Sequence, residues 1–321
     1  MNAVNLDKII QGVKEGKTRP IAKAISLIER ETPRAGDLLK GIYSETGRAY
    51  LLGITGPPGA GKSTLTDQIV KQLRQEDKKV GVIAVDPTSP FSGGAILGDR
   101  IRMNDLNTDP GVFIRSLASK GSLGGLSPAV YDTALIFDAA GFEYIIIETV
   151  GVGQTEVEIV ELADTTVVVT VPEAGDDIQT FKAGLMEIGD IFVVNKGDRP
   201  GTDKMKLLIE NMLEIVELDW RPPVLKSIAH EGKGIEDIIK DVKNHRTYLS
   251  KNEKLRQDRK KALKKKITQR LQYLFEKNIL QDIFRSEQFN NILNEIIERK
   301  SDPITGIEQI VDEKCPWLKD K

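Results

Sequence analysis

The sequence has little cysteine, since Cys315 is the single thiol among 321 residues. One thiol cannot form a disulfide within the chain, which indicates a reducing compartment. No apolar stretch approaches the roughly 20 residues that a membrane-spanning helix needs, and the N-terminus lacks the basic region and apolar run of a signal peptide. We therefore expect a cytoplasmic protein with no membrane association.

Charge of one sign, repeats and low-complexity tracts are also lacking. Lys and Arg number 46 against 48 for Asp and Glu, which gives a formal net charge of −2. This balance argues against wholesale binding to nucleic acid, and we expect no nucleic-acid partner. The 40% of hydrophobic and 29% of charged residues are ordinary for a globular protein.

The length of 321 residues predicts either one large domain with appendages or two domains. We divide the chain into a helical N-terminal extension over residues 1–47, a domain of alternating strands and helices over 48–247, and a C-terminal helical arm over 248–321. The candidate strands are Tyr50–Thr55, Lys79–Val85, Val112–Arg115, Tyr144–Thr149, Thr166–Val171, Ile191–Asn195 and Val224–Ile228. Most are near-continuous apolar runs, which predicts an α/β fold with a doubly wound, mostly parallel sheet.

A glycine-rich stretch after the first of these strands matches G-x-x-x-x-G-K-S/T, the phosphate-binding loop of P-loop NTPases. It comprises Gly56, Pro57, Pro58, Gly59, Ala60, Gly61, Lys62 and Ser63, and Thr64 follows. Glycines let backbone N–H groups approach phosphates, and the start of the next helix adds positive charge. We expect Lys62 to contact the β- and γ-phosphates and the Ser63 hydroxyl to bind Mg²⁺.

A second motif begins where the strand over Tyr144–Thr149 ends in Glu148, with Gly151 three positions later. A nucleotidase needs a carboxylate here to hold Mg²⁺ through water and a glycine N–H to sense the γ-phosphate. Most GTPases have Asp at this position, whereas this chain has Glu148. Gln154 is either a residue that orients the attacking water or a solvated loop side chain.

A third motif, Asn195-Lys196-Gly197-Asp198, follows an apolar strand. The Asp198 carboxylate can accept hydrogen bonds from N1–H and the exocyclic amine of guanine, whereas adenine offers no such pair. Asn195 and the stem of Lys196 would hold the loop and flank the base. The sequence therefore predicts GTP and GDP as the bound nucleotides, and not ATP.

Two more acidic residues lie between these motifs. Asp86 ends the second strand, on the side of the phosphate loop, where it could bind Mg²⁺ through water or activate the attacking water. Asp99 lies in a glycine-rich segment with Arg100 and Arg102, which is either a mobile switch or an ordinary loop. The two arginines are candidates for an arginine finger, but neither is identified as one.

The combination of GPPGAGKST, AVDPTSP, GGAILGDRIRM, ETVGVGQTE and NKGD resembles the MeaB/ArgK family of P-loop GTPases, and the resemblance covers essentially the whole chain. It implies a GTPase chaperone that gates adenosylcobalamin loading and protects or reactivates an adenosylcobalamin-dependent acyl-CoA mutase, chiefly methylmalonyl-CoA mutase. The human relative is the methylmalonic aciduria type A protein. The resemblance also implies a homodimer, an adenosyltransferase as a further partner, and no cobalamin bound directly by this chain.

The resemblance assigns roles by position. Lys62 and Ser63 would contact phosphate and Mg²⁺, and the residues around Mg²⁺ and the attacking water would be Asp86, Asp99 and Glu148. The base-recognition residues would be Asn195, Lys196 and Asp198. Residues 173–182 resemble a switch that responds to the partner, and Lys182 aligns with a lysine implicated in partner-stimulated hydrolysis.

The chain departs from the family pattern in two places. Pro172-Glu173-Ala174 stands where the family often has glycines after the proline, which would stiffen that switch. In the last guanine loop, Ser227-Ile228-Ala229 puts Ile228 where the family usually has serine. We expect the Ala229 N–H to bind the guanine carbonyl nonetheless.

Three alternative interpretations have less support in the residues. A small-molecule kinase has no use for a guanine motif. A metal-delivery GTPase of the nickel-insertion type, or another partner-regulating GTPase, shares the glutamate variant, but the soft ligands Cys315, His230 and His245 are scattered. The basic stretch Lys251–Arg270 could contact nucleic acid, although its apolar stripe favours packing or dimerisation. Further helices are predicted over Gln288–Arg299 and Thr305–Asp312, in what would be a dimerisation arm.

Overall fold

The structure of the protein is a computed structural model, and it describes residues 6–86, 106, 108–118, 128–149, 159, 162–172, 188–215 and 218–314. The chain divides into two compact units, Met1–Asp258 and Arg259–Lys321. The predicted division into three parts, at 47/48 and 247/248, stays a prediction. None of the described helices is long and apolar enough to cross a membrane.

The described residues of the first unit are built around a seven-stranded sheet in the order β3-β2-β4-β1-β5-β6-β7. Every neighbouring pair of strands is parallel. The strands are β1 (Tyr50–Thr55), β2 (Val80–Asp86), β3 (Val112–Ala118), β4 (Tyr144–Glu148), β5 (Thr165–Thr170), β6 (Ile191–Val194) and β7 (Val224–Lys226). All the candidate strands are therefore confirmed, with ends that differ by a few residues, and so is the doubly wound α/β fold.

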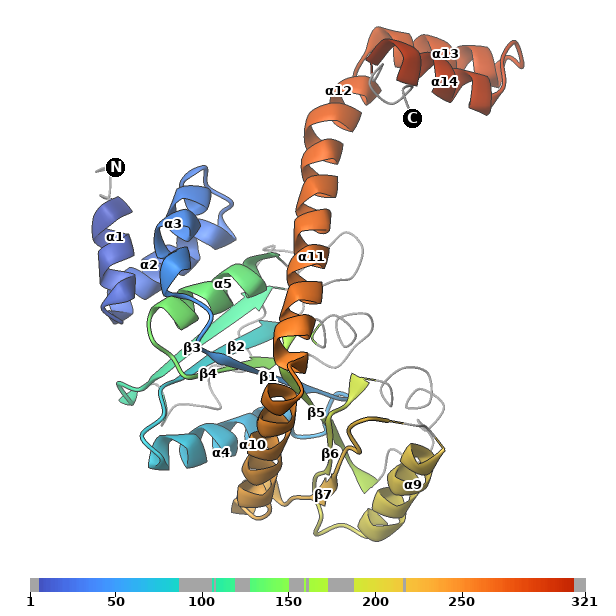
Figure 1. The fold of residues 1–321 in the computed structure, drawn as a ribbon. Coiled ribbons are helices and arrows are strands. Elements are labelled where there is room, and N and C mark those ends of the chain that lie inside the picture. Colours follow the sequence, from blue (N-terminus) through green and yellow to red (C-terminus); the bar gives the residue numbers. More distant parts are fainter. Residues whose placement is uncertain are drawn as a thin grey trace. The chain divides into compact units, whose positions relative to one another are not determined.

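Helices cover both faces of this sheet (Figure 1). Alternate residues of a strand point to opposite faces, so in β4 Ile145 and Ile147 join the core beneath α5 (Pro128–Ala139). Ile146, between them, joins the core beneath α4 (Lys62–Gln75) and α10 (Ile235–Lys251). On β5 and β6, Val168 and Phe192 pack against α9 (Thr202–Glu214).

Three helices precede the sheet: α1 (Leu6–Lys14), α2 (Thr18–Glu29) and α3 (Arg34–Ile42). Their buried side chains, among them Val13, Ile25 and Leu38, share one core with Phe137 of α5. Figure 1 shows the three helices beside α5. The predicted helical N-terminal extension is confirmed, and it covers apolar surface that α5 would otherwise expose.

One buried carboxylate fastens this extension to the sheet domain. The Asp138 side chain on α5 accepts hydrogen bonds from three successive backbone N–H groups, those of Gly47, Arg48 and Ala49, at 2.5, 3.2 and 3.0 Å. Hydrogen bonds from N–H groups to a charged oxygen are stronger than those between neutral groups. The linker that enters β1 is therefore held at every residue over this stretch.

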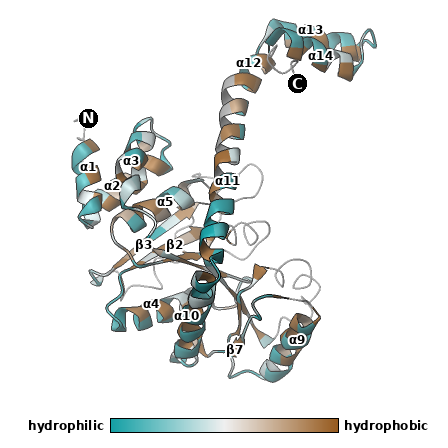
Figure 2. Ribbon diagram, in the orientation of Figure 1, coloured by the Kyte–Doolittle hydropathy of each residue, from teal (hydrophilic) through white to brown (hydrophobic). Residues whose placement is uncertain are grey.

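The second unit is helical. It contains most of α11 (Lys254–Phe275), followed by a π-helical turn over Glu276–Leu280, α12 (Gln281–Phe284), α13 (Glu287–Ile297) and α14 (Pro303–Lys314). Ser286 caps α13 by accepting a hydrogen bond from the Phe289 N–H at 3.2 Å, as an N-cap serine does. The helices predicted over Gln288–Arg299 and Thr305–Asp312 are confirmed. Figure 2 shows hydrophobic residues recurring along α11, α13 and α14.

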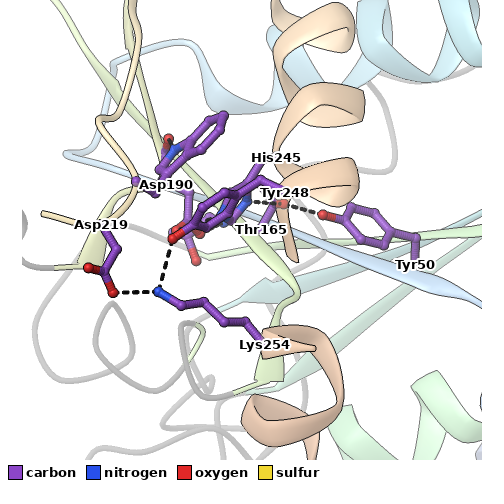
Figure 3. Close-up of polar contacts among 9 residues, drawn as sticks. Tyr50, Thr165, Asp190, Asp219, His245, Tyr248 and Lys254 are labelled. Carbon is purple, nitrogen blue, oxygen red and sulfur yellow. Dashed lines mark hydrogen bonds and ion pairs between the residues drawn. The ribbon is translucent and has the colours of Figure 1, made fainter. Parts of the chain in front are cut away.

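A polar network joins α10 to the starts of two strands (Figure 3). The Tyr50 hydroxyl lies 2.5 Å from the Thr165 hydroxyl oxygen, which lies 2.8 Å from Nδ1 of His245. On its other side, His245 Nε2 lies 3.4 Å from a carboxylate oxygen of Asp190. The imidazole is 3% exposed, and this burial lowers the pKa of His245 to about 4.

Beside this network, the junction between α10 and α11 is held by contacts of Lys254. Its ammonium lies 2.6 Å from the Asp219 carboxylate and 2.9 Å from the Tyr248 hydroxyl. Trp220 packs beside both rings, with its own ring tilted by 43° against that of His245 at 4.7 Å and by 41° against that of Tyr248 at 5.1 Å. Because Asp219 is largely exposed, the packed aromatic rings matter more here than the ion pair.

Replacing His245 should change how stability depends on pH. The native pKa of His245 is about 4, whereas the ordinary value of 6.5 applies to the unfolded chain. Between these values only the unfolded chain binds the proton, so His245 lowers native stability as the pH falls from 6.5 towards 4. His245→Gln should remove this loss, which amounts to about 3 kcal/mol at most in the free energy of unfolding.

The measurement is denaturant unfolding of parent and variant between about pH 7.5 and about pH 4.5. Burial raises the pKa of Asp190 to about 7, which gives both proteins a slope of opposite sign, so the difference between the two curves is the informative quantity. His230→Gln, which alters an exposed histidine, serves as the matched control. A difference between parent and His245→Gln that stays constant across this pH range would contradict the prediction.

Candidate functional site

The carboxyl ends of four parallel strands, β1, β4, β6 and β7, lie at one edge of the sheet. In open α/β sheets, ligands bind in the crevice outside these ends. Glu148 is the last residue of β4, and the phosphate loop, the Asn195 motif and the Ser227–Ala229 segment follow β1, β6 and β7. The fold therefore brings these described residues to one place.

The phosphate loop has the backbone conformation that its glycines permit. Gly56, Gly59 and Gly61 have φ values of +134°, +75° and +86°, which residues with a Cβ rarely adopt. A Cβ on Gly56 would lie 1.9 Å from the carbonyl oxygen of Val169 on β5. The loop therefore packs too closely on the neighbouring strand to accept any other residue at its first position.

Lys62 is the first residue of α4, and its ammonium is buried inside the curve of the loop. Nζ donates to the carbonyl oxygens of Gly56 at 2.8 Å and Pro57 at 3.0 Å. The N-terminus of α4 contributes its own N–H groups and partial positive charge at the same point. Pro58 and Thr64 are exposed around it. The arrangement suits a bound phosphate group.

The Glu148 carboxylate is buried against α4. One oxygen, Oε1, lies 2.6 Å from the Ser63 hydroxyl, and the other, Oε2, lies 2.8 Å from the Thr66 hydroxyl. Glu148 pairs with Ala84 in β2, and the same strand ends two residues later in the buried Asp86. Hydroxyl and carboxylate oxygens are the donors that Mg²⁺ prefers, so this corner could hold that ion.

Sequence analysis missed Thr66. A threonine inside a predicted helix carries no motif, and the one available signal was its position three residues after Ser63, which places both on the same side of a helix. The predicted proximity of Ser63 and Glu148 is observed. Their roles in binding Mg²⁺ stay predictions.

Asn195 joins three loops. Its side-chain N–H donates to the carbonyl oxygen of Ala60 in the phosphate loop at 2.9 Å. Its side-chain oxygen accepts from the Ser227 hydroxyl at 3.0 Å and the Ala229 N–H at 3.1 Å. The Ala229 N–H, which we expected to contact guanine, is thus a partner of Asn195 in this structure, and its role toward the base stays a prediction.

The rest of the third motif forms a tight loop against the segment after β7. Lys196 has a left-handed φ of +58°, and the Gly197 N–H donates to the Ser227 carbonyl at 2.9 Å. Ile228 forms an antiparallel bridge with Lys233. Asp198 is exposed at the outer end of the loop, where a base could reach its carboxylate.

Several predicted residues lie outside the described residues: Asp99, Arg100, Arg102, Gly151, Gln154, Lys182 and the rest of 173–182. Among the described residues, no group of three or more His, Cys, Asp or Glu side chains is arranged to hold a metal ion. The described part of the site therefore consists of the phosphate loop, the Glu148 carboxylate with its partners Ser63 and Thr66, and the loops that Asn195 joins.

The chain is similar to several known proteins. A family model described as "Methylmalonyl Co-A mutase-associated GTPase MeaB" matches residues 21–286. A Pyrococcus abyssi protein named as a GTPase is 46% identical over 313 residues, which is 96% of each chain. The Escherichia coli protein named GTPase ArgK is 35% identical over 324 residues, which is 97% of each chain.

The chain is also similar to an animal protein and to a protein of solved structure. A Caenorhabditis elegans protein named "Methylmalonic aciduria type A homolog, mitochondrial" is 31% identical over 282 residues, covering 81% of this chain and 71% of that protein. A crystal structure described as an LAO/AO transport system kinase matches with a TM-score of 0.74 at 29% identity, covering 97% of this chain and 99% of that one.

Asn195→Ala should weaken nucleotide binding, because it removes the side chain that joins the phosphate loop to the segment after β7. The Ala60 carbonyl, Ser227 hydroxyl and Ala229 N–H would each lose a partner, at about 1–3 kcal/mol for each group left buried. We expect GDP affinity to fall about 10-fold or more, since about 1.4 kcal/mol corresponds to a factor of ten.

Calorimetric titration with GDP measures this effect. Asn244→Ala is the matched control, because Asn244 is an exposed asparagine on α10 whose side chain bonds Asp241 at 2.9 Å. An Asn195→Ala variant that binds GDP as the control does would show that the joined loops do not determine affinity.

Proposed function

Because the chain belongs to the MeaB family of P-loop GTPases, we propose that it hydrolyses GTP in order to gate adenosylcobalamin loading into a cobalamin-dependent acyl-CoA mutase and to protect or reactivate that enzyme. The observation that carries the GTPase part is the Asn195 side chain, which joins the phosphate loop to the loops of the guanine motif. The mutase part rests on the family, which is described as associated with methylmalonyl-CoA mutase. That enzyme is therefore the first partner to test.

The phosphate loop supports the chemistry of the first step. Hydrolysis proceeds by in-line attack of water on the γ-phosphate, and negative charge spreads over the phosphate oxygens. Lys62, held on the carbonyls of Gly56 and Pro57, would offset that charge together with the N–H groups at the start of α4. Preorganised donors of this kind lower the barrier because they need not reorient during the reaction.

Mg²⁺ belongs to the proposal as the ion bound with the nucleotide. Ser63, Asp86 and Glu148 supply hydroxyl and carboxylate oxygens at one corner, and Asp99 would be the fourth residue of this set. When bound, the ion would neutralise part of the charge on the phosphate groups. The chain's own contribution is to keep the Glu148 carboxylate fixed against α4.

Base selection is proposed for the loop after β6. Asp198 would accept the two guanine donors, and Lys196 and Asn195 would support the loop on which it stands. Ser227, Ile228 and Ala229 lie against that loop and would close the base site from the side of β7. Adenine, the base of ATP, does not offer these two donors, so the Asp198 carboxylate would be left without them.

The groups proposed to respond to the partner are in the 173–182 segment, where Lys182 would assist hydrolysis once the mutase is bound. An adenosyltransferase is proposed as a further partner, because the cofactor that the mutase needs must be adenosylated before loading. We propose that cobalamin itself is held by these partners and not by this chain.

A homodimer is proposed through the second unit. Ile267 and Leu271 on α11 are 53% and 61% exposed, and Ile297 on α13 is 77% exposed. These apolar side chains are exposed on α11 and α13, and a second copy would present the same surface, as a symmetric dimer requires. Pairing of two such surfaces would remove them from water.

Stimulation by a mutase tests the proposed function. The chain alone should hydrolyse GTP slowly, and methylmalonyl-CoA mutase should raise kcat at least about 10-fold, because a group completed by a partner can be worth about 10³ to 10⁵ in GTPases. Phosphate release is the measurement. Lys62→Ala with the mutase is the control for contaminating activity, and a rate that no cobalamin-dependent mutase of the source organism alters would refute the chaperone function.

A charged side chain introduced among the exposed apolar residues of α11 tests the proposed dimer. Ile267→Glu should raise the dimer dissociation constant about 10-fold or more, because a carboxylate would have to be desolvated in the interface. Sedimentation at several protein concentrations gives that constant. Thr268→Glu introduces the same charge at the next exposed position and should change it little, so equal behaviour of the two variants would argue against this interface.

A further inference from the structure

Thr66 is placed to fix the orientation of the Glu148 carboxylate. Its hydroxyl lies 2.8 Å from Oε2, while the Ser63 hydroxyl lies 2.6 Å from Oε1. A carboxylate accepts hydrogen bonds and both hydroxyls donate, so each oxygen of Glu148 has a donor on α4. Thr66 is fully buried and Glu148 is nearly so, and solvent therefore does not substitute readily for either donor.

The helix and the sheet together determine this contact. Ser63 and Thr66 are three residues apart on α4 and lie on the same side of it. Glu148 is the last residue of β4 and pairs with Ile54 of β1 and Ala84 of β2, so its backbone is fixed on both sides. A threonine inside a helix commonly bonds the carbonyl one turn back, whereas the Thr66 hydroxyl reaches a carboxylate on another element.

The length of the glutamate side chain explains why a second donor matters. Glutamate has one more methylene and one more torsion angle than aspartate, so a hydrogen bond to Oε1 alone would leave the carboxylate free to turn about it. A donor on Oε2 removes that freedom. Fixing a carboxylate in this way lets it bind a metal or its water without reorienting.

We propose that Thr66 is a positioning residue of the magnesium site, which acts by holding the Glu148 carboxylate in the orientation that Mg²⁺ requires. This inference rests on the magnesium site proposed above and assigns Thr66 no contact with nucleotide or metal. Residues that orient metal ligands typically contribute about 10-fold to 100-fold to metal affinity. Thr66 should therefore change how much Mg²⁺ the protein needs, and not how it binds nucleotide without the ion.

The experiment measures retention of a fluorescent GDP analogue by the full chain over a series of free Mg²⁺ concentrations. Thr66→Val keeps the shape of the side chain and removes its hydroxyl. It should raise the Mg²⁺ concentration for half-maximal slowing of nucleotide release about 10-fold or more, and leave the release rate in excess chelator unchanged. Thr66→Ser keeps the donor and should stay within about twofold of the parent.

Two controls separate this role from a general effect on the fold. Thr133→Val removes the hydroxyl of another fully buried threonine, on α5, and should leave the Mg²⁺ dependence at the parental value. The second control is the double variant in a Glu148→Gln background. Since Thr66 acts through Glu148, adding Thr66→Val to Glu148→Gln should have no further effect on the Mg²⁺ requirement.

The outcomes are distinguishable. Parental nucleotide release that does not depend on Mg²⁺ would overturn the proposed magnesium site, and this inference with it. A Mg²⁺-dependent parent and a Thr66→Val variant with the same Mg²⁺ requirement would overturn the role of Thr66 alone. Should Thr66→Val fail to fold, Thr66→Ala removes the same hydroxyl and is judged by the same criterion.

Discussion

The hydrogen bonds of the Asn195 carboxamide are the interaction on which the site depends most. They tie the phosphate loop, through Ala60, to the segment after β7, through Ser227 and Ala229. Because the amide is buried, each of these bonds is costly to leave unmade. The loops that would bind phosphate and base therefore cannot adopt their conformations independently.

Helix α4 gives the same region a second point of connection. Its first residue, Lys62, lies in the phosphate loop, and within the next turn Ser63 and Thr66 bond the carboxylate at the end of β4. A helix is stiff over this length, so a shift of the phosphate loop moves the donors of Glu148 as well. The proposed phosphate site and the proposed metal site are in this way mechanically coupled through one element.

The sequence was sufficient for the architecture and the family, because both rest on local patterns: apolar runs predicted every described strand, and quoted motifs carried the family resemblance. The parallel order of the sheet then brings motifs such as Gly56–Ser63 and Asn195–Asp198 to one edge. Contacts between distant residues could not be predicted in this way. Thr66 resembles any helical threonine until β4 is placed beside it, and two partners of His245, Thr165 and Asp190, come from segments 80 and 55 residues away in the sequence.

The attachment of Asp138 to Gly47, Arg48 and Ala49 bears on how such a chain can be shortened or recombined. A cut between Gly47 and Arg48 would remove one of these three donors, turn a second into a chain terminus, and also uncover the apolar side of α5. The N-terminal helices are therefore not an interchangeable module that gene fusion could add or exchange at residue 48. A chain without them would need a compensating change at Asp138 and on the apolar side of α5.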